Sequence, residues 1–249
     1  MKSVLYIMWI RQLKRYWRSK ARMIGSLGQP VLFLIALGFG FGAVYQKAGQ
    51  GNYIDFLAPG IIAMSILFTA MFTGIEVIWD RQFGFLKETL VAPVSRTKIM
   101  IGRTLGGATV ASIQGLIVLI ISLILGFRPI SFALIPLAFL FMFMIAFLFT
   151  ALGTAIASLL DDMQGFQLII NFVIMPIFFL SGALFPLDNL PSVLSIITKI
   201  NPLSYGVDGI RGSLTGLSHL GLALDFGVMF VLIAIVSMLG SYLFSKVEA

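Results

Sequence analysis

The chain alternates between long apolar runs and short polar connections. Six of the runs are long enough to cross a hydrocarbon core, which takes about 20 residues of helix. They are predicted near 24–45, 57–79, 99–126, 132–158, 165–185 and 223–245. The pattern predicts an all-α integral membrane protein whose 249 residues form a single transmembrane domain.

The first 22 residues have a different, amphipathic pattern. On a helical projection one arc collects aromatic and aliphatic side chains, and the opposite side collects cations. The apolar arc consists of Tyr6, Trp9, Ile10, Leu13, Tyr16 and Trp17, and the cationic side of Arg11, Lys14, Arg15, Arg18 and Arg22. This arrangement predicts an interfacial helix over 1–22 that lies in the headgroup plane and contacts membrane lipids.

The segment 80–96, between the second and third runs, carries too many charges to enter lipid. One helical stripe is formed by Trp79, Phe83, Leu86 and Leu90. Lys87 and Glu88 lie off that stripe and are expected to face water or a partner. Pro93 disfavours helix at the residue before it, and Ser95 is a candidate N-cap for the next run. The segment is therefore predicted to be a short amphipathic helix at the membrane surface, able to transmit force to two spans; a plain connecting loop is the alternative.

The connection 186–216 contains two apolar pieces that are each too short to span. The first follows Pro191, and Asn201 and Pro202 separate it from the second. In the second piece, Asp208 and Arg211 stand three residues apart and are expected to pair. The pattern predicts two short helices that form a re-entrant hairpin in the outer leaflet; a loop lying flat on the membrane is the alternative.

Composition and charge agree with a membrane location. Hydrophobic residues make up 59% of the chain and charged residues 11%, against about 25% in soluble domains. Thirteen Lys and Arg residues lie in the first 22 residues, in 80–103 or in the tail, against four in the other connections. The positive-inside rule therefore places both termini and the 80–96 segment in the cytoplasm, with the chain multi-pass in the inner (plasma) membrane. The net charge of +7 is explained by this distribution, so nucleic acid is not an expected partner.

The sequence offers little catalytic chemistry. It has no G-x-x-x-x-G-K-[ST] motif to hold nucleotide phosphates, and its single histidine, His219, has no carboxylate–histidine cluster around it. We therefore expect no catalytic, cofactor or metal site in this chain. Glu76 lies inside a predicted span, one turn from its cytoplasmic end, and is expected to pair with a cation near the cytoplasmic side. Small residues such as Gly102 and Gly106 permit close helix approach, either within the subunit or across a dimer.

Three stretches carry a resemblance to a known family. The stretch 85–96, FLKETLVAPVSR, is similar to the cytoplasmic loop of ABC type-2 exporter permeases. The stretches 179–191, FLSGALFPLDNLP, and 201–211, NPLSYGVDGIR, resemble the C-terminal signature of that family. The likeness covers nearly the whole chain and is strongest to the drug-resistance, nodulation-factor and polysaccharide-export branches.

The resemblance implies a dimer of six-span subunits with two cytoplasmic ATPase subunits beneath it. ATP and Mg²⁺ would then be bound by the partner subunits and not by this chain. The residues expected to couple to the ATPase are Arg81, Phe83, Phe85, Leu86, Lys87, Glu88 and Thr89, with the interfacial-helix cations Arg11, Lys14, Arg15 and Arg18. The family's outer re-entrant helices would correspond to 191–200 and 202–214. The expected site residues of this hairpin are Pro191, Asn201, Pro202, Asp208 and Arg211.

The expected function is the membrane subunit of an ATP-driven exporter that moves an amphipathic or saccharide-type substrate outward by alternating access. The first alternative is a self-contained ion-coupled carrier, which predicts buried charges and internal repeats. The second is a membrane anchor that recruits a cytoplasmic partner, which leaves the hairpin without a purpose.

Overall fold

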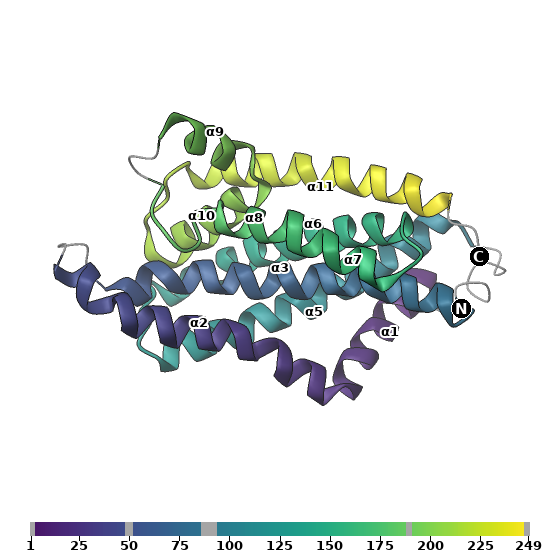
Figure 1. The fold of residues 1–249 in the computed structure, drawn as a ribbon, viewed down its shortest axis with the longest axis horizontal. Helices are drawn as coiled ribbons and strands as arrows, with labels where there is room; N and C mark the ends of the chain where they lie inside the picture. The colour runs from purple at the N-terminus through teal and green to yellow at the C-terminus, as the bar shows by residue number, and fades with distance from the viewer. Residues whose placement is uncertain (1–2, 48–51, 86–93, 188–190, 247–249) are drawn as a thin grey trace.

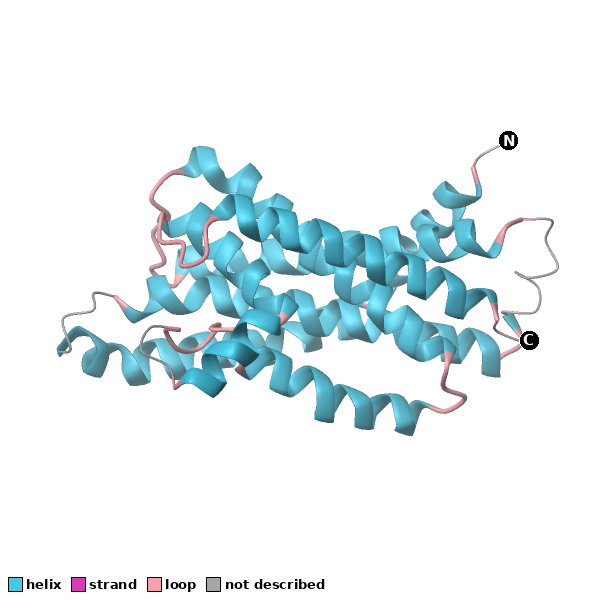
Figure 2. Ribbon diagram, turned by 90° about the horizontal axis from the view of Figure 1, so that it is seen from above, coloured by secondary structure: helices cyan, strands magenta, loops and turns pink. Residues whose placement is uncertain are grey.

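The structure, a computed structural model, describes residues 3–47, 52–85, 94–187 and 191–246. These residues form an elongated bundle of helices, with no strand among them (Figure 2). The helix α1 and the C-terminal end of α11 lie together at one end, here called the α1 end, and α9 and α10 lie at the opposite α10 end (Figure 1). The all-α prediction is confirmed.

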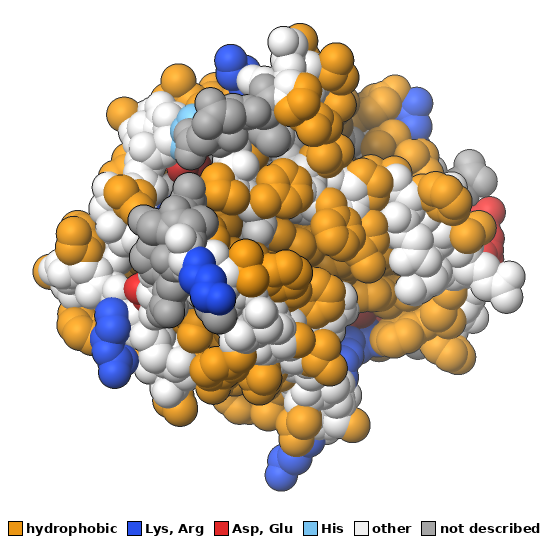
Figure 3. Space-filling view, turned by 60° about the vertical axis from the view of Figure 1, so that its left-hand side comes forward, with side chains coloured by type: hydrophobic (Ala, Val, Ile, Leu, Met, Phe, Trp, Pro, Cys, Tyr) orange, Lys and Arg blue, Asp and Glu red, His pale blue; other side chains and the backbone are white. Residues whose placement is uncertain are grey.

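Five helices in the described part of the chain are long and apolar enough to cross a membrane. They correspond to five of the six predicted spans. Their bounds are α2 Lys20–Lys47, α3 Tyr53–Gln82, α5 Arg96–Ile124, α6 Ile135–Ser158 and α11 Leu222–Ser245. A short 3₁₀ turn, η1 (Phe132–Leu134), leads into α6. Figure 3, in which the α10 end comes forward, shows many exposed hydrophobic side chains and scattered Lys and Arg.

The sixth predicted span, near 165–185, is a shorter run of helix. It consists of α7 (Met163–Ile169), a π-helical turn η2 (Ile170–Ile174) and α8 (Met175–Phe179). The helix ends before residue 185 because the chain turns there, with Gly182 in the left-handed region at φ 75°.

The segment from α7 onward nevertheless runs the length of the bundle. At its start, the indole of Trp79 near the end of α3 donates to the sulfur of Met163. At its end, the hydroxyl of Tyr53, the first residue of α3, donates to the Leu184 carbonyl over 3.0 Å. The segment 163–184 therefore reaches from one end of the longest helix to the other.

The amphipathic helix α1 (Val4–Arg18) ends earlier than the predicted residue 22, because the chain breaks at Ser19 and Arg22 belongs to α2. It packs along α5 over two glycines. A Cβ atom on Gly102 would lie 2.8 Å from the Met8 Cβ, and one on Gly106 would lie 2.6 Å from the Gln12 Cβ. These two glycines therefore serve packing within the subunit, which decides a question that the sequence left open.

The central helix is α3, which is buried along most of its length between α2, α5, α6 and α10. It crosses α6 with almost no side chain between the two backbones. A Cβ atom on Gly74 would lie 2.4 Å from the Gly153 carbonyl group. The close crossing sets the position of α3, on which the site described below is built.

We expect the substitution Gly74→Val to lower stability much more than Gly40→Val. The first forces two helix backbones apart, an overpacking that costs about 1–3 kcal/mol or more. The second adds a side chain on α2 where nothing lies within 4 Å of the new Cβ. Thermal unfolding midpoints in detergent compare the two variants. Equal shifts would show that the α3–α6 crossing does not limit stability.

The chain forms two helices where the hairpin is predicted, α9 (Ser192–Ile200) and α10 (Pro202–Thr215). They are separated at Asn201, whose side chain accepts from the Leu203 amide over 3.0 Å and donates to the Ile177 carbonyl over 2.6 Å. Pro202 supplies the first residue of α10, where no amide hydrogen is needed. The hydrogen bond to Ile177 places Asn201, where the chain reverses, beside α8. This contact lies before the turn at Gly182 in the chain.

Candidate functional site

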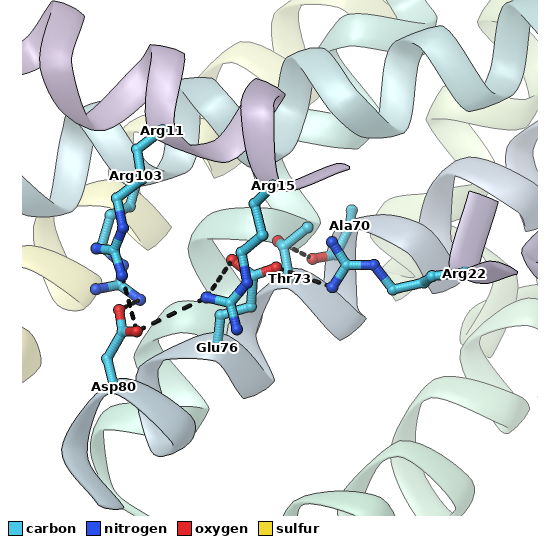
Figure 4. Close-up of polar contacts among 8 residues, drawn as sticks. All are labelled: Arg11, Arg15, Arg22, Ala70, Thr73, Glu76, Asp80 and Arg103. Carbon is cyan, nitrogen blue, oxygen red and sulfur yellow. Dashed lines mark hydrogen bonds and ion pairs between the residues drawn. The ribbon is translucent and has the colours of Figure 1, made fainter. Parts of the chain in front are cut away.

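At the α1 end, arginines from α1 meet two carboxylates in the last turns of α3 (Figure 4). The Arg11 guanidinium lies 2.9 Å from Asp80, and that of Arg15 lies 3.5 Å from Glu76 and 3.7 Å from Asp80. Both carboxylates are buried, because Glu76 and Asp80 are 1% and 5% exposed. One turn of helix separates them, so they present their charge on the same face of α3.

Two further arginines complete this group from other helices. Arg22, in the first turn of α2, lies 3.0 Å from Glu76, and Arg103 of α5 lies 2.7 Å from Asp80. Arg103 is as deeply buried as its partner, at 3% exposed. The six residues, here called the arginine–carboxylate cluster, are Arg11, Arg15, Arg22, Glu76, Asp80 and Arg103 (Figure 4). The cluster joins α1, α2, α3 and α5 at one point.

The cluster corrects part of the prediction for the cationic face of α1. Glu76 does pair with cations, as expected. Arg11 and Arg15, however, turn inward onto α3, and their guanidinium groups also lie over the Phe85 and Trp79 rings. Lys14 and Arg18 are exposed, as the headgroup prediction requires. The difference arises because the paired carboxylates of α3 stabilise two of the four cations more than headgroups would.

The apolar side of α1 is also partly turned toward protein. The buried Tyr16 hydroxyl donates to the Gln114 side chain, which in turn donates to Ser26 over 3.0 Å. Burial raises the pKa of Tyr16 and the charge of Arg22 lowers it, with a net rise that keeps the phenol a donor. The Trp9 indole donates to Thr109 over 3.0 Å. These bonds hold α1 against α5, while Tyr6 and Trp17 remain exposed.

The end of α3 lies next to the cluster. Arg81, which the sequence places in the coupling segment, is helical, and its guanidinium binds the Asp161 carboxylate and the carbonyls of Ser158 and Leu160. It therefore ties α3 to the loop after α6 and does not project from the surface. Phe83 is 80% exposed. The remaining predicted coupling residues, Leu86, Lys87, Glu88 and Thr89, lie outside the described residues.

At the α10 end, the prediction that Asp208 and Arg211 pair is wrong. The Asp208 carboxylate accepts from the Ser218 hydroxyl over 3.0 Å and from the His219 and Leu220 amides over 2.9 and 2.7 Å. Arg211 donates to the Gly182 carbonyl over 2.8 Å and to the Phe56 carbonyl over 3.4 Å. Each side chain is used to hold α10 to a different neighbouring segment.

One buried carboxylate was missed from the sequence. Asp225, in the first turn of α11, is fully buried, and its carboxyl group lies within hydrogen-bonding reach of the Asp208 carboxyl group. The available signal was an acidic residue just inside the last apolar run. Across the described ranges, no three His, Asp or Glu side chains gather as a metal ion would require.

Comparisons with known proteins agree with this architecture. The family model described as ABC-2 type transporter matches residues 3–215. Transport permease ycf38 of Cyanophora paradoxa is 30% identical over 98% of this chain and 88% of its own length. Nodulation protein J of Rhizobium leguminosarum bv. viciae is 30% identical over 88% of this chain and 85% of its own. The chain therefore belongs to the ABC-2 type transporter family of membrane permeases.

Proposed function

We propose that this chain is the membrane-spanning subunit of an ATP-driven exporter. The observation that carries the proposal is the arginine–carboxylate cluster, which lies where α3 leads into the charged 80–96 segment. Through it α1, α2 and α5 are bound to the same two carboxylates of α3. Movement applied at the end of α3 is thus passed to four helices together.

In this proposal a cytoplasmic ATPase subunit binds α1 and the 80–96 segment. Phe83 supplies an exposed apolar contact, while Arg81 holds the end of α3 to the loop after α6. Lys87 and Glu88 supply charges toward the partner. ATP and Mg²⁺ belong to the partner, so hydrolysis takes place outside this chain.

The α1 end is proposed to be cytoplasmic. Described basic residues of that argument belong to α1, to the end of α3 and to the start of α5, which lie toward that end, whereas Lys199 and Arg211 belong to α9 and α10 at the other. The segment 163–184 then supplies the sixth crossing. A helix of 17 residues reaches about 25 Å, and the turn after it covers the rest of the hydrocarbon core.

With that orientation, α9 and α10 form a hairpin that enters the outer leaflet and returns at Asn201. Such a hairpin would shape the outer exit for an amphipathic or saccharide-type substrate. The helix α2 is scarcely buried, with apolar side chains such as Leu32, Ile35 and Phe39 exposed. This face suits lipid and a second copy of the subunit, which we propose completes a homodimer.

The test is whether an ATPase accompanies the chain and depends on Glu88. We expect the tagged protein, purified from its own membranes, to carry vanadate-sensitive ATP hydrolysis. Glu88→Lys should abolish that activity and export while the permease still inserts in the membrane. Removing one partner of a desolvated charge pair costs about 2–5 kcal/mol of binding free energy.

The matched control is Lys47→Glu, a charge reversal at the opposite end of the bundle, which should retain the ATPase. If Glu88→Lys keeps both the ATPase and normal export, the coupling assignment is wrong.

The buried Asp225 favours a second candidate, an ion-coupled carrier, since a buried carboxyl group within a span is typical of proton or cation pathways. The two functions differ in their energy source. Export that stops with vanadate and continues with a protonophore supports the ATP-driven reading, and the reverse result supports the carrier.

A further inference from the structure

A cavity of about 490 Å³ lies between α2 and α3 beside the arginine–carboxylate cluster. Its volume falls within the roughly 300–1,000 Å³ of small-molecule sites. Tyr16, Arg22 and Gln29 line one side, and α3 lines the other from Met64 to Trp79. Neither the pairing of the cluster nor the coupling role of α3 requires this space.

The α3 wall of the cavity is amphipathic. Ser65, Thr69 and Thr73 recur every four residues and so form one polar stripe. Phe68 and Phe72 lie beside that stripe and give an apolar surface. Ser65 is 2% exposed, and its hydroxyl has no hydrogen-bond partner in the described part of the chain. A buried hydroxyl without a partner costs free energy, so an occupant with acceptor atoms would be stabilised here.

The charge next to the cavity is unbalanced. In the cluster four guanidinium groups face two carboxylates, which leaves a net charge of +2. Arg22 belongs both to the cluster and to the cavity lining. Half-buried positive charge in excess of its partners favours binding of an anion, and guanidinium groups suit phosphate oxygens in particular.

We propose that this cavity binds an anionic phospholipid, with its phosphate at Arg22 and an acyl chain along Phe68 and Phe72. A lipid fits better than a soluble anion because the cavity wall is mostly apolar. It also fits because α2, which borders the cavity, exposes Ile24 and Leu32 on its outer surface, where hydrocarbon is the expected solvent. The bound lipid would neutralise part of the excess charge and fill the space between α2 and α3. This inference does not depend on the proposed export function.

Trp79 lines the cavity and provides a direct probe. The chain has three tryptophans, so a Trp9→Phe/Trp17→Phe variant reports from Trp79 alone. In mixed micelles, phosphatidylglycerol with brominated acyl chains should quench this fluorescence at a lower mole fraction than brominated phosphatidylcholine. Adding Arg22→Gln should weaken the preference about fivefold, the factor expected for one basic residue near an anionic headgroup.

Two matched variants and one competitor complete the test. Arg18→Gln removes an exposed charge at the same end and should leave the preference unchanged. Thr69→Phe fills the cavity without changing its charge and should abolish quenching by both lipids, even if Arg22→Gln fails to fold. Inorganic phosphate should not displace the brominated lipid. Equal quenching by the two lipids, an equal effect of Arg18→Gln, or displacement by free phosphate would overturn the proposal.

Discussion

Asp80→Asn is expected to destabilise the protein by about 3–5 kcal/mol, the cost of leaving a buried charge without its partner. Asp80 is the ion-pair partner of Arg103, which is buried at 3% exposed. The Asp80 carboxylate also accepts a hydrogen bond from the Arg11 guanidinium over 2.9 Å. Removing its charge leaves Arg103 with no carboxylate within 4 Å, while the net charge of the cluster rises from +2 to +3.

Unfolding titrated with sodium dodecyl sulfate in mixed micelles measures this loss. The control is Asp161→Asn, which breaks the ion pair between Asp161 and Arg81. The Asp161 side chain is 91% exposed. Exposed pairs contribute only about 0–1 kcal/mol, so the control should change little. The double variant Asp80→Asn/Arg103→Met removes both charges and should recover most of the stability. Similar losses from the two single variants would show that burial does not set the strength of the cluster.

Asp208→Asn is expected to reduce export at least tenfold without affecting ATPase association. The Asp208 carboxylate accepts hydrogen bonds from Ser218, His219 and Leu220, which hold the loop before α11 to α10. Hydrogen bonds to a charged group contribute about 1.5–3 kcal/mol each, and an asparagine would turn an NH₂ donor toward these donors. The α10 end of the bundle should therefore loosen while the α1 end keeps its structure.

Transport and ATPase co-purification, measured on the same preparation, separate the two effects. Ser218→Ala removes one neutral donor and should reduce export much less. Normal export by Asp208→Asn would show that α10 does not shape the path, and loss of the ATPase would show that the two ends of the bundle are not independent.

The elements that depend on local pattern were predictable. Apolar runs of about 20 residues predict spans because lipid cannot hydrogen-bond an exposed backbone. Five such helices are found in the described chain. The break at Asn201–Pro202 was predictable for the same kind of reason, since Pro has no amide hydrogen and Asn can bond the backbone near it. The amphipathic α1 was predicted by its periodicity, although its end at Arg18 was not.

Contacts between distant segments were decided only by the tertiary structure. The sequence predicts on which side of α1 Arg11 and Arg15 lie, but not that Glu76 and Asp80 are brought opposite them. That follows from the packing of α1 along α5 over Gly102 and Gly106, which brings its arginines within reach of the α3 carboxylates. The spacing of Asp208 and Arg211 suggested an ion pair, yet each has partners from segments that the fold brings to α10. Hydrophobic periodicity is a property of neighbours in sequence, whereas the pairing of charges depends on distances that only packing sets.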